Sequence, residues 1–230
     1  MERYNRQIML PELGEEGQRR LQSAKVLIVG VGGLGSPIAL YLTGAGVGTI
    51  GLVDDDVVSV SNLQRQVLYS ESEMGMTKVF QAKKRLEALN SSVHIEAYPV
   101  RLTPENAETL IAPYDIVVDG CDNFATRYLI NDTCVRLGKV YVHGAIRAFD
   151  GQVSVCNYQG GPDYRHFFPN EEEMLSMPHP PKGVIGVTPG IVGCVEATEV
   201  LKIIGGYGEV LSGKLWVIDL RTMQTHILTC

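Results

Sequence analysis

Apolar and polar positions along the chain fall into short blocks that predict strands and helices in turn. Residues 25–30 form an apolar, β-branched run that ends at a glycine, which is typical of a buried parallel strand. Residues 36–45 have helical character, and residues 49–53 form a second short apolar run. These segments predict a βαβ unit, and a short helix is expected before it at residues 14–21.

The alternation continues through the first half of the chain. Residues 79–89 predict an amphipathic helix, with Val79 and Leu86 on its apolar face and Lys83 on the opposite face. Residues 94–98 and 116–119 are then expected to be strands. Strands that alternate with helices predict a sheet whose faces are covered by helices.

The second half has a different pattern. Strands are expected at residues 140–143 and 151–158, and the alternating polarity of the second predicts a half-exposed antiparallel strand. Residues 159–182 show neither the helical spacing nor the strand alternation of apolar residues, so we expect a long loop there. A helix at residues 192–204 and a hairpin of residues 214–220 and 224–228 follow. The predicted fold class is α/β: a Rossmann-like nucleotide-binding domain with a mixed, mostly parallel sheet continued by antiparallel strands.

Composition narrows the class of protein. The 230 residues fit one domain, and 45% hydrophobic with 20% charged residues is ordinary for a globular protein. No run approaches the roughly 18 apolar residues of a membrane span, and the N-terminus lacks the apolar region of a signal peptide. We therefore expect a cytoplasmic protein that binds no membrane. The net charge of −6 gives no support to nucleic-acid binding.

The first chemical signal is a glycine-rich turn with GxGxxG spacing, formed by Gly30, Gly32, Gly33 and Gly35. It follows a predicted strand and opens a predicted helix, where backbone N–H groups and the helix dipole favour a phosphate. Asp54 follows at the end of the second strand, where such folds place the acid that binds ribose hydroxyls. These features predict a nucleotide site and do not distinguish NAD from ATP.

A polar run after Asp54 favours ATP. It contains Asp56, Asn62, Arg65 and Gln66, and Lys78 follows it. The cations could neutralise a triphosphate, which carries more charge than a dinucleotide's pyrophosphate. Asp122 and Asn123 follow the strand at residues 116–119, at the same carboxyl edge of the sheet. Asp122 is the expected Mg²⁺ ligand, because Mg²⁺ at phosphate sites typically takes one or two carboxylates.

Five pieces of sequence together resemble the ThiF/MoeB/HesA adenylyltransferases, relatives of the ubiquitin-activating enzymes. The pieces are RYNRQ (residues 3–7), GVGGLGS (30–36), SNLQRQ (61–66), Lys78 and DGCDNFATR (119–127). The resemblance implies ATP-dependent adenylylation of the C-terminal Gly-Gly carboxylate of a ubiquitin-like sulfur carrier in thiamine or molybdopterin biosynthesis, with release of pyrophosphate. It also implies a homodimer and a single domain over residues 1–230.

The resemblance further implies roles for segments and residues. Residues 1–22 would be an N-terminal arm, 23–139 the nucleotide-binding half, and 140–230 the carrier-binding half with a crossover loop at about 159–187. Arg6, Arg65, Lys78 and Asp122 would be catalytic, with Arg6 reaching the partner subunit's site. The nucleotide would be held by Gly30, Gly32, Gly33, Gly35, Asp54, Asp56, Asn62, Arg65, Gln66, Lys78, Asp122 and Asn123.

The chain also departs from this family. Many members bind zinc through two CxxC pairs, but here Asp163 and His166 stand at the first pair and the sequence ends at Cys230. We expect no structural zinc, and ordinary surface residues are favoured over a mixed site of these three. Residues 170–189 contain no cysteine, so we expect a separate protein to deliver sulfur. Packing roles are favoured for Cys121 and Cys194, and no catalytic role is assigned to His143, His166 or His179.

Two alternatives stay open at this point. The same fold could adenylylate a small-molecule or RNA-attached carboxylate. The glycine turn and Asp54 also fit an NAD-dependent oxidoreductase or a nucleotide-binding module without catalysis, although these leave Arg65, Lys78 and Asp122 unexplained.

Overall fold

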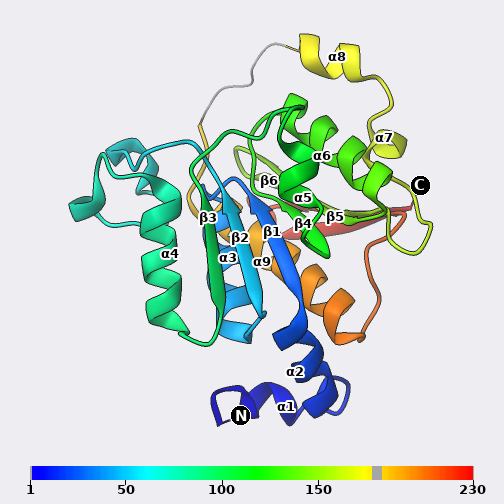
Figure 1. The fold of residues 1–230 in the computed structure, drawn as a ribbon. Helices are drawn as coiled ribbons and strands as arrows, with labels where there is room; N and C mark the ends of the chain where they lie inside the picture. The colour runs from blue at the N-terminus through cyan, green and yellow to red at the C-terminus, as the bar shows by residue number, and fades with distance from the viewer. Residues whose placement is uncertain (1, 178–182, 230) are drawn as a thin grey trace.

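The structure, a computed structural model that describes residues 2–177 and 183–229, contains an eight-stranded sheet in the order β3-β2-β1-β4-β5-β6-β7-β8 (Figure 1). Its strands are β1 (Lys25–Val29), β2 (Thr49–Val53), β3 (His94–Tyr98), β4 (Ile116–Asp119), β5 (Val140–Arg147), β6 (Asp150–Cys156), β7 (Lys214–Asp219) and β8 (Gln224–Thr229). The pairs from β3 to β5 are parallel, and those from β5 to β8 are antiparallel. The predicted fold class is confirmed.

Helices cover both faces of the parallel half, as the alternation along the sequence predicts. They are α1 (Asn5–Ile8), α2 (Gly14–Ser23), α3 (Gly35–Ala45), α4 (Lys78–Leu89), α5 (Ala107–Ile111), α6 (Phe124–Leu137), α7 (Tyr164–Phe167), α8 (Glu171–Ser176) and α9 (Val187–Gly205), with short 3₁₀ turns η1 (Glu2–Tyr4), η2 (Val60–Asn62) and η3 (Glu71–Glu73). One core lies between the sheet and α3, α4 and α9; the other lies between the sheet and α5 and α6. Successive β1 residues enter opposite cores, Ile28 the first and Leu27 the second, so the strand is apolar from Val26 to Val29.

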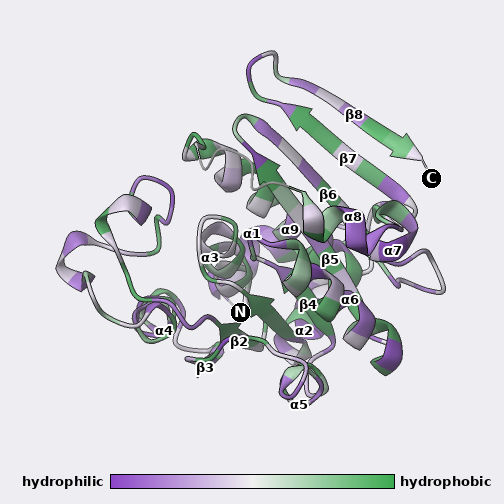
Figure 2. Ribbon diagram, turned by 90° about the horizontal axis from the view of Figure 1, so that it is seen from above, coloured by the Kyte–Doolittle hydropathy of each residue, from purple (hydrophilic) through white to green (hydrophobic). Residues whose placement is uncertain are grey.

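The outer strands of the antiparallel half, β7 and β8, extend beyond this covered region. Figure 2 shows β7 and β8 at the outer edge of the sheet, beyond β6. Every described residue of β8 is exposed, and Ile218 is the buried residue of β7. The sheet therefore has an open face next to its covered part.

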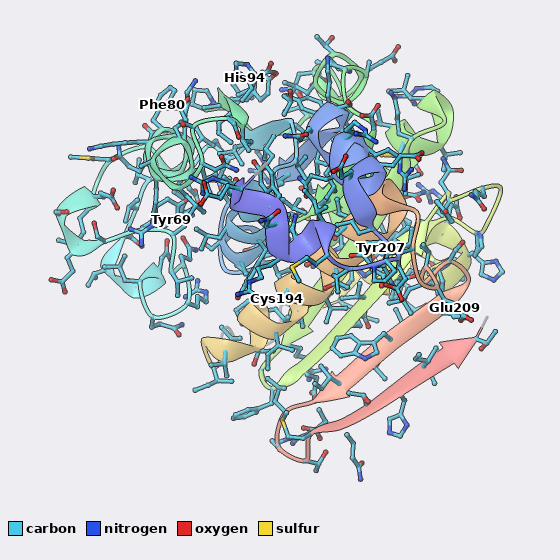
Figure 3. All side chains as sticks on the ribbon, turned by 90° about the horizontal axis from the view of Figure 1, so that it is seen from below. Tyr69, Phe80, His94, Cys194, Tyr207 and Glu209 are labelled. Atoms are coloured by element: carbon cyan, nitrogen blue, oxygen red, sulfur yellow. The ribbon has the colours of Figure 1, made fainter. Side chains whose placement is uncertain are left out.

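The N-terminal helices close the end of the sheet where the parallel strands begin (Figures 1 and 3). The amide groups of Gln7 and Gln18 both donate to the carbonyl oxygen of Ala45, the last residue of α3. Tyr4 packs on Gly46, where a Cβ would lie 2.5 Å from the tyrosine ring. Helix α1 is thus fixed at the C-terminal end of α3.

The structure differs from the sequence prediction at several helices, among them α6, α7, α8 and α9. Helix α6 was not predicted, because polar residues such as Arg127, Asn131 and Thr133 are buried on it and remove the expected apolar stripe. Helices α7 and α8 lie within the segment predicted to have no regular structure. Helix α9 begins at Val187, five residues before the predicted start; Pro189 is tolerated in the first turn, where no intrahelical N–H bond is lost.

Within the described residues, no helix has the length and apolar character that crossing a membrane requires.

A buried carboxyl group on α9 leads to a prediction about stability. Both carboxyl oxygens of Glu196 lack a hydrogen-bond partner among the described residues, and burial raises the pKa well above 4.5. The folded protein therefore keeps a proton that the unfolded chain releases, so stability falls as pH rises above 4.5. We expect Glu196→Gln to gain up to about 1.4 kcal/mol relative to the wild type for each pH unit above 4.5, measured by urea unfolding.

Glu199, one turn further along α9, is the matched control. It is also buried, but its carboxylate pairs with Lys202 and accepts the N–H of Leu211 at 2.9 Å. Glu199→Gln should therefore lose stability at pH 7. An unfolding free energy of Glu196→Gln that tracks the wild type from pH 5 to 8 would contradict the neutral state of Glu196.

Candidate functional site

A cleft of about 1550 Å³ lies at the carboxyl ends of the parallel strands and continues over the open face of the antiparallel half. It collects most of the residues that the sequence singled out as candidates. Gly30, Gly32, Gly33, Asp54, Asp56, Asn62, Arg65, Gln66, Lys78, Asp122 and Asn123 all line it. Gly35 and Arg6 are not among its lining residues.

The glycine turn joins β1 to α3 at the floor of the cleft. Gly30 has a φ of +90°, and a Cβ there would lie 2.6 Å from the carbonyl oxygen of Gly120. A Cβ on Gly35 would lie 2.1 Å from the carbonyl oxygen of Gly30, so this glycine lets the first turn of α3 pack on the strand. Side chains larger than hydrogen are excluded at both positions. The cleft therefore faces a bare backbone at the N-terminus of a helix, which suits an anion.

Asp54 directly follows β2 and is held by the backbone beside the glycine turn. Its carboxylate accepts the N–H of Val31 at 2.8 Å and the N–H of Asp56 at 2.9 Å. Burial raises the pKa of Asp54, and the positive charge of Lys78 opposes that shift. These bonds fix a carboxylate in the cleft at the position where ribose hydroxyls are bound in related folds.

Lys78, the first residue of α4, carries a nearly buried ammonium group. Its side chain is 3% exposed, and Nζ lies 2.8 Å from a carboxylate oxygen of Asp56, which is 69% exposed. The backbone N–H of Lys78 also donates to the carbonyl oxygen of Asp56. Lys78 is thus a fixed cation at the wall of the cleft, with one exposed carboxylate as its partner.

Arg65 and Gln66 follow the η2 turn and lie beside the glycine turn, Arg65 next to Gly33 and Gln66 next to Gly32. One guanidinium nitrogen of Arg65 donates to the carbonyl oxygen of Ser61 at 3.0 Å, and the half-buried side chain lines the cleft. Gln66 is buried beside Gly32, and its Oε1 has no partner among the described residues. Both side chains therefore keep hydrogen-bonding capacity that the protein itself does not use.

Asp122 and Asn123 follow β4 and have different local roles. The carboxylate of Asp122 is exposed, with the amide of Asn123 as a neighbour at 3.5 Å. The Oδ1 of Asn123 accepts the N–H of Thr126 at 2.9 Å and so caps α6. The carboxylate of Asp122 is therefore available to bind a cation, whereas Oδ1 of Asn123 is already used as the cap of α6.

The carboxylates at this edge suit a hard cation such as Mg²⁺. Ligand oxygens of Asp54, Asp55 and Asp56 lie within 4.8 Å of one another, and Asp122 has no cationic partner in the described part of the chain. Carboxylate oxygens are the ligands that Mg²⁺ takes beside substrate phosphates. The donor set fits this ion.

A buried polar network beneath the cleft was missed by sequence reasoning. Oδ2 of Asp119 accepts hydrogen bonds from the hydroxyl of Tyr141 at 2.9 Å, from Nδ1 of His143 at 2.9 Å and from Nε of Arg127 at 3.1 Å. Burial alone would raise the pKa of Asp119, but Arg127 and His143 outweigh it and hold the pKa at about 2. The network is a buried ion pair with its hydrogen bonds satisfied.

This network reaches the cleft through two side chains that line it. Arg127 also donates to the carbonyl oxygen of Cys121 at 3.1 Å, and Gln152 on β6 lies 3.2 Å from Nε2 of His143. His143 therefore has a partner on each ring nitrogen, although the sequence suggested no role for it. The sequence did offer one signal for this network: a histidine in the predicted strand at residues 140–143, which follows a predicted strand that ends in an aspartate, residues 116–119.

Cysteines and the remaining histidines lie apart from this chemistry. The thiol of Cys121 donates to Asp119 at 2.8 Å, and burial raises its pKa well above 9.0, so it is not a thiolate. Cys194 is half-buried on α9 (Figure 3). Asp163 caps α7 by accepting the N–H of His166 at 3.1 Å. His179 and Cys230 lie outside the described residues, so the mixed metal site stays unsupported.

Comparisons with known proteins give a consistent result. The ThiF family description matches residues 4–230. The chain is 51% identical to a sulfur carrier protein adenylyltransferase of Thermus thermophilus, over 100% of this chain and 87% of that protein. It is 47% identical to a probable molybdopterin-synthase adenylyltransferase of Porphyra purpurea and 50% identical to adenylyltransferase and sulfurtransferase MOCS3 of Sus scrofa. These alignments cover 96% and 94% of this chain, but 59% and 48% of the relatives.

Solved structures show the same fold. A crystal structure of PaaA superposes with a TM-score of 0.84 at 25% identity, covering 99% of this chain and 72% of that one. The structure of E. coli MccB with ATP gives a TM-score of 0.79 at 26% identity, covering 93% of this chain and 65% of that one.

Proposed function

Because this chain belongs to the ThiF family, we propose that it is an adenylyltransferase that uses ATP to activate the C-terminal Gly-Gly carboxylate of a ubiquitin-like sulfur carrier. The names of its relatives support this activity, and both sulfur-carrier and molybdopterin-synthase adenylyltransferases are among them. Residues 140–230 would bind the carrier. A separate protein would deliver sulfur, since residues 170–189 offer no cysteine to receive the activated carrier.

The observation that carries the proposal is the set of charges around one cleft. Arg65 and Lys78 face it together with the bare backbone of the glycine turn, and Asp122 also lines it. Two cations and a helix N-terminus match a triphosphate. An NAD-dependent oxidoreductase would leave these cations unused.

The proposed roles follow from the geometry of each group. The glycine turn would hold phosphate oxygens, Asp54 the ribose, and Asn62, Arg65, Gln66 and Lys78 the polyphosphate, with Asp56 orienting Lys78. Asp122, assisted by the aspartates after β2, would hold Mg²⁺, which neutralises phosphate charge when it is bound. Asn123 would contribute its amide group, because its carbonyl oxygen already caps α6.

The reaction needs little acid–base catalysis. The carrier's carboxylate is ionised at pH 7, and its oxygen attacks the α-phosphorus of ATP. The bond from that phosphorus to the bridging oxygen breaks, and pyrophosphate leaves with the electron pair. The barrier lies mainly in bringing two anions together and in the charge that moves to pyrophosphate. Arg65 and Lys78 are the groups of this chain that would stabilise that charge.

Carrier-dependent ATP–pyrophosphate exchange tests the proposed function. Recombinant ubiquitin-like carriers of the thiamine and molybdopterin types, each ending in Gly-Gly, should support exchange, and versions lacking the last glycine should not. Full exchange without any carrier protein would favour a small-molecule carboxylate instead. Calorimetry that shows NAD binding and no ATP binding would overturn the proposal.

Arg6 can serve this reaction only in a second subunit. Its helix α1 lies at the C-terminal end of α3, whereas the glycine turn lies at the N-terminal end (Figure 1). The 11 residues of α3 span about 16 Å. We therefore propose a homodimer in which Arg6 reaches the partner's cleft.

Mixing two inactive variants tests this arrangement. Arg6→Ala and Asp122→Ala should each lose exchange activity, but a heterodimer would combine one intact Asp122 with the other subunit's intact Arg6. Random pairing after joint refolding should restore roughly a quarter of the wild-type sites. The control is the Arg6→Ala protein refolded by itself under the same conditions. No recovery in a mixture shown to contain heterodimers would remove the proposed role of Arg6.

A further inference from the structure

Gln152 lies between the two ends of the cleft. On β6 its neighbours across the strands are Ala145 of β5 and Val217 of β7. All three line the cleft, which extends from the glycine turn past Gln152 to His226 on β8. A chain that lies along β6 from the open face of the antiparallel strands towards the phosphate end would run past Gln152.

The amide of Gln152 is held in one orientation by the buried network. Nδ1 of His143 lies 2.9 Å from the carboxylate of Asp119, so the imidazole carries its proton on Nδ1 and donates it to the carboxylate. Nε2 is then an acceptor and requires a donor, which is Nε2 of Gln152 at 3.2 Å. This bond determines which end of the Gln152 amide group is the nitrogen and which is the oxygen. Oε1 of Gln152 is left without a partner among the described residues.

We propose that Gln152 binds the peptide backbone of the segment that carries the reacting carboxylate, and that His143 is the positioning residue that orients it. This inference rests on the proposed function. The oriented amide offers an acceptor, Oε1, and one remaining N–H donor side by side. Backbone N–H and C=O groups of an extended peptide present the complementary pair.

The chemistry of the site favours backbone recognition over recognition of a side chain. Gln152 is uncharged and half-buried on a regular strand, so it adds specificity without attracting free anions. A Gly-Gly segment has no side chains by which it could be recognised, but its backbone amide groups remain available for hydrogen bonds. A small-molecule carboxylate without an amide next to the carboxyl group would gain nothing from Gln152.

A semisynthetic carrier tests the proposal directly. The carrier that supports exchange is prepared with its normal Gly-Gly end or with its last peptide nitrogen methylated, which removes one N–H. In the wild type, methylation should raise the KM for the carrier about 5- to 10-fold, the effect of one lost hydrogen bond. Gln152→Ala should raise the KM for the normal carrier similarly and leave the KM for ATP unchanged.

Non-additivity is the deciding result. With Gln152→Ala, methylation should have almost no further effect, because the partner of the N–H is already gone. Gln22→Ala, at an exposed glutamine on α2, is the matched control and should respond to methylation as the wild type does. Independent, multiplicative effects of methylation and Gln152→Ala would overturn the proposal, although carrier-dependent exchange would stand. If no carrier supports exchange, the proposed function itself fails.

Acid provides a second readout for His143. Burial lowers its pKa from 6.5, and Asp119 on β4, Arg127 on α6, Tyr141 on β5 and Tyr164 on α7 are the charged and titratable groups around it. Once protonated, His143 donates from both nitrogens, and Gln152 must turn its oxygen inward. The KM for the carrier should therefore rise below pH 6.5 in the wild type and stay flat in Gln152→Ala. An equal rise of the KM for the carrier in the wild type and in Gln152→Ala would overturn the role of His143.

Discussion

Replacing Arg65 by alanine is expected to lower the rate of carrier-dependent ATP–pyrophosphate exchange by roughly 10³-fold, the effect typical of an arginine that stabilises phosphoryl charge in the transition state. The guanidinium group faces the cleft and is tied to the protein through the carbonyl oxygen of Ser61. Its loss therefore removes charge stabilisation without disturbing the core. The free energy of unfolding should change by less than about 1 kcal/mol.

Two further variants sharpen this prediction. Arg65→Lys keeps the charge but not the planar fork of donors, so it should recover only part of the lost rate. Arg85→Ala removes an exposed arginine on α4, outside the cleft, and should leave exchange unchanged. Wild-type exchange by a folded Arg65→Ala protein would remove Arg65 from the site.

Replacing Asp119 by asparagine is expected to lower the free energy of unfolding by about 3 to 5 kcal/mol, because Arg127 would be left as a buried and unpaired charge. Asparagine keeps the shape of the side chain but removes the charge that holds Arg127 and His143. Exchange activity should fall as well, since these residues orient side chains that line the cleft. Urea unfolding at pH 7 measures the loss.

The pH dependence of this loss follows from the pKa of about 2. The folded pKa lies below the ordinary value of 3.8, so the stabilisation is fully present above 3.8 and disappears as pH falls towards 2. The difference between Asp119→Asn and the wild type should therefore shrink in that range. Asp115→Asn, at an exposed aspartate that accepts the N–H of Lys25, should lose about 1 kcal/mol or less. An equally small loss in Asp119→Asn would contradict the buried ion pair.

Local patterns predicted most of the strands because these strands are short, apolar and ended by glycine or acidic residues. The same reasoning missed α6, whose buried face includes Arg127 and Asn131. Those polar residues are acceptable inside because Asp119 and the backbone N–H of Tyr164 meet them there. Asp119 belongs to the preceding strand and Tyr164 lies 33 residues beyond Asn131, so no period within α6 could reveal these partners.

Most of the candidate site was also predictable, because the motif residues follow strands whose carboxyl ends meet at one edge. Asn123 shows the limit of this reasoning. The sequence placed it in the nucleotide site, and it lines the cleft, but its Oδ1 is occupied as the cap of α6. Arg6 shows a second limit, because a motif at the N-terminus does not reveal which subunit's cleft its side chain can reach.

The sequence by itself determined the βαβ start of the fold, the glycine turn that excludes side chains, and the cations and carboxylates that follow the strands. These features are local, since they depend on residues within one turn or one strand end. Only the tertiary structure decided that Asp119, Arg127, His143 and Gln152 form one network, and that α1 lies far from the glycine turn. Hydrogen bonds between strands and the packing of helices set those relations, and both join residues that are remote in sequence.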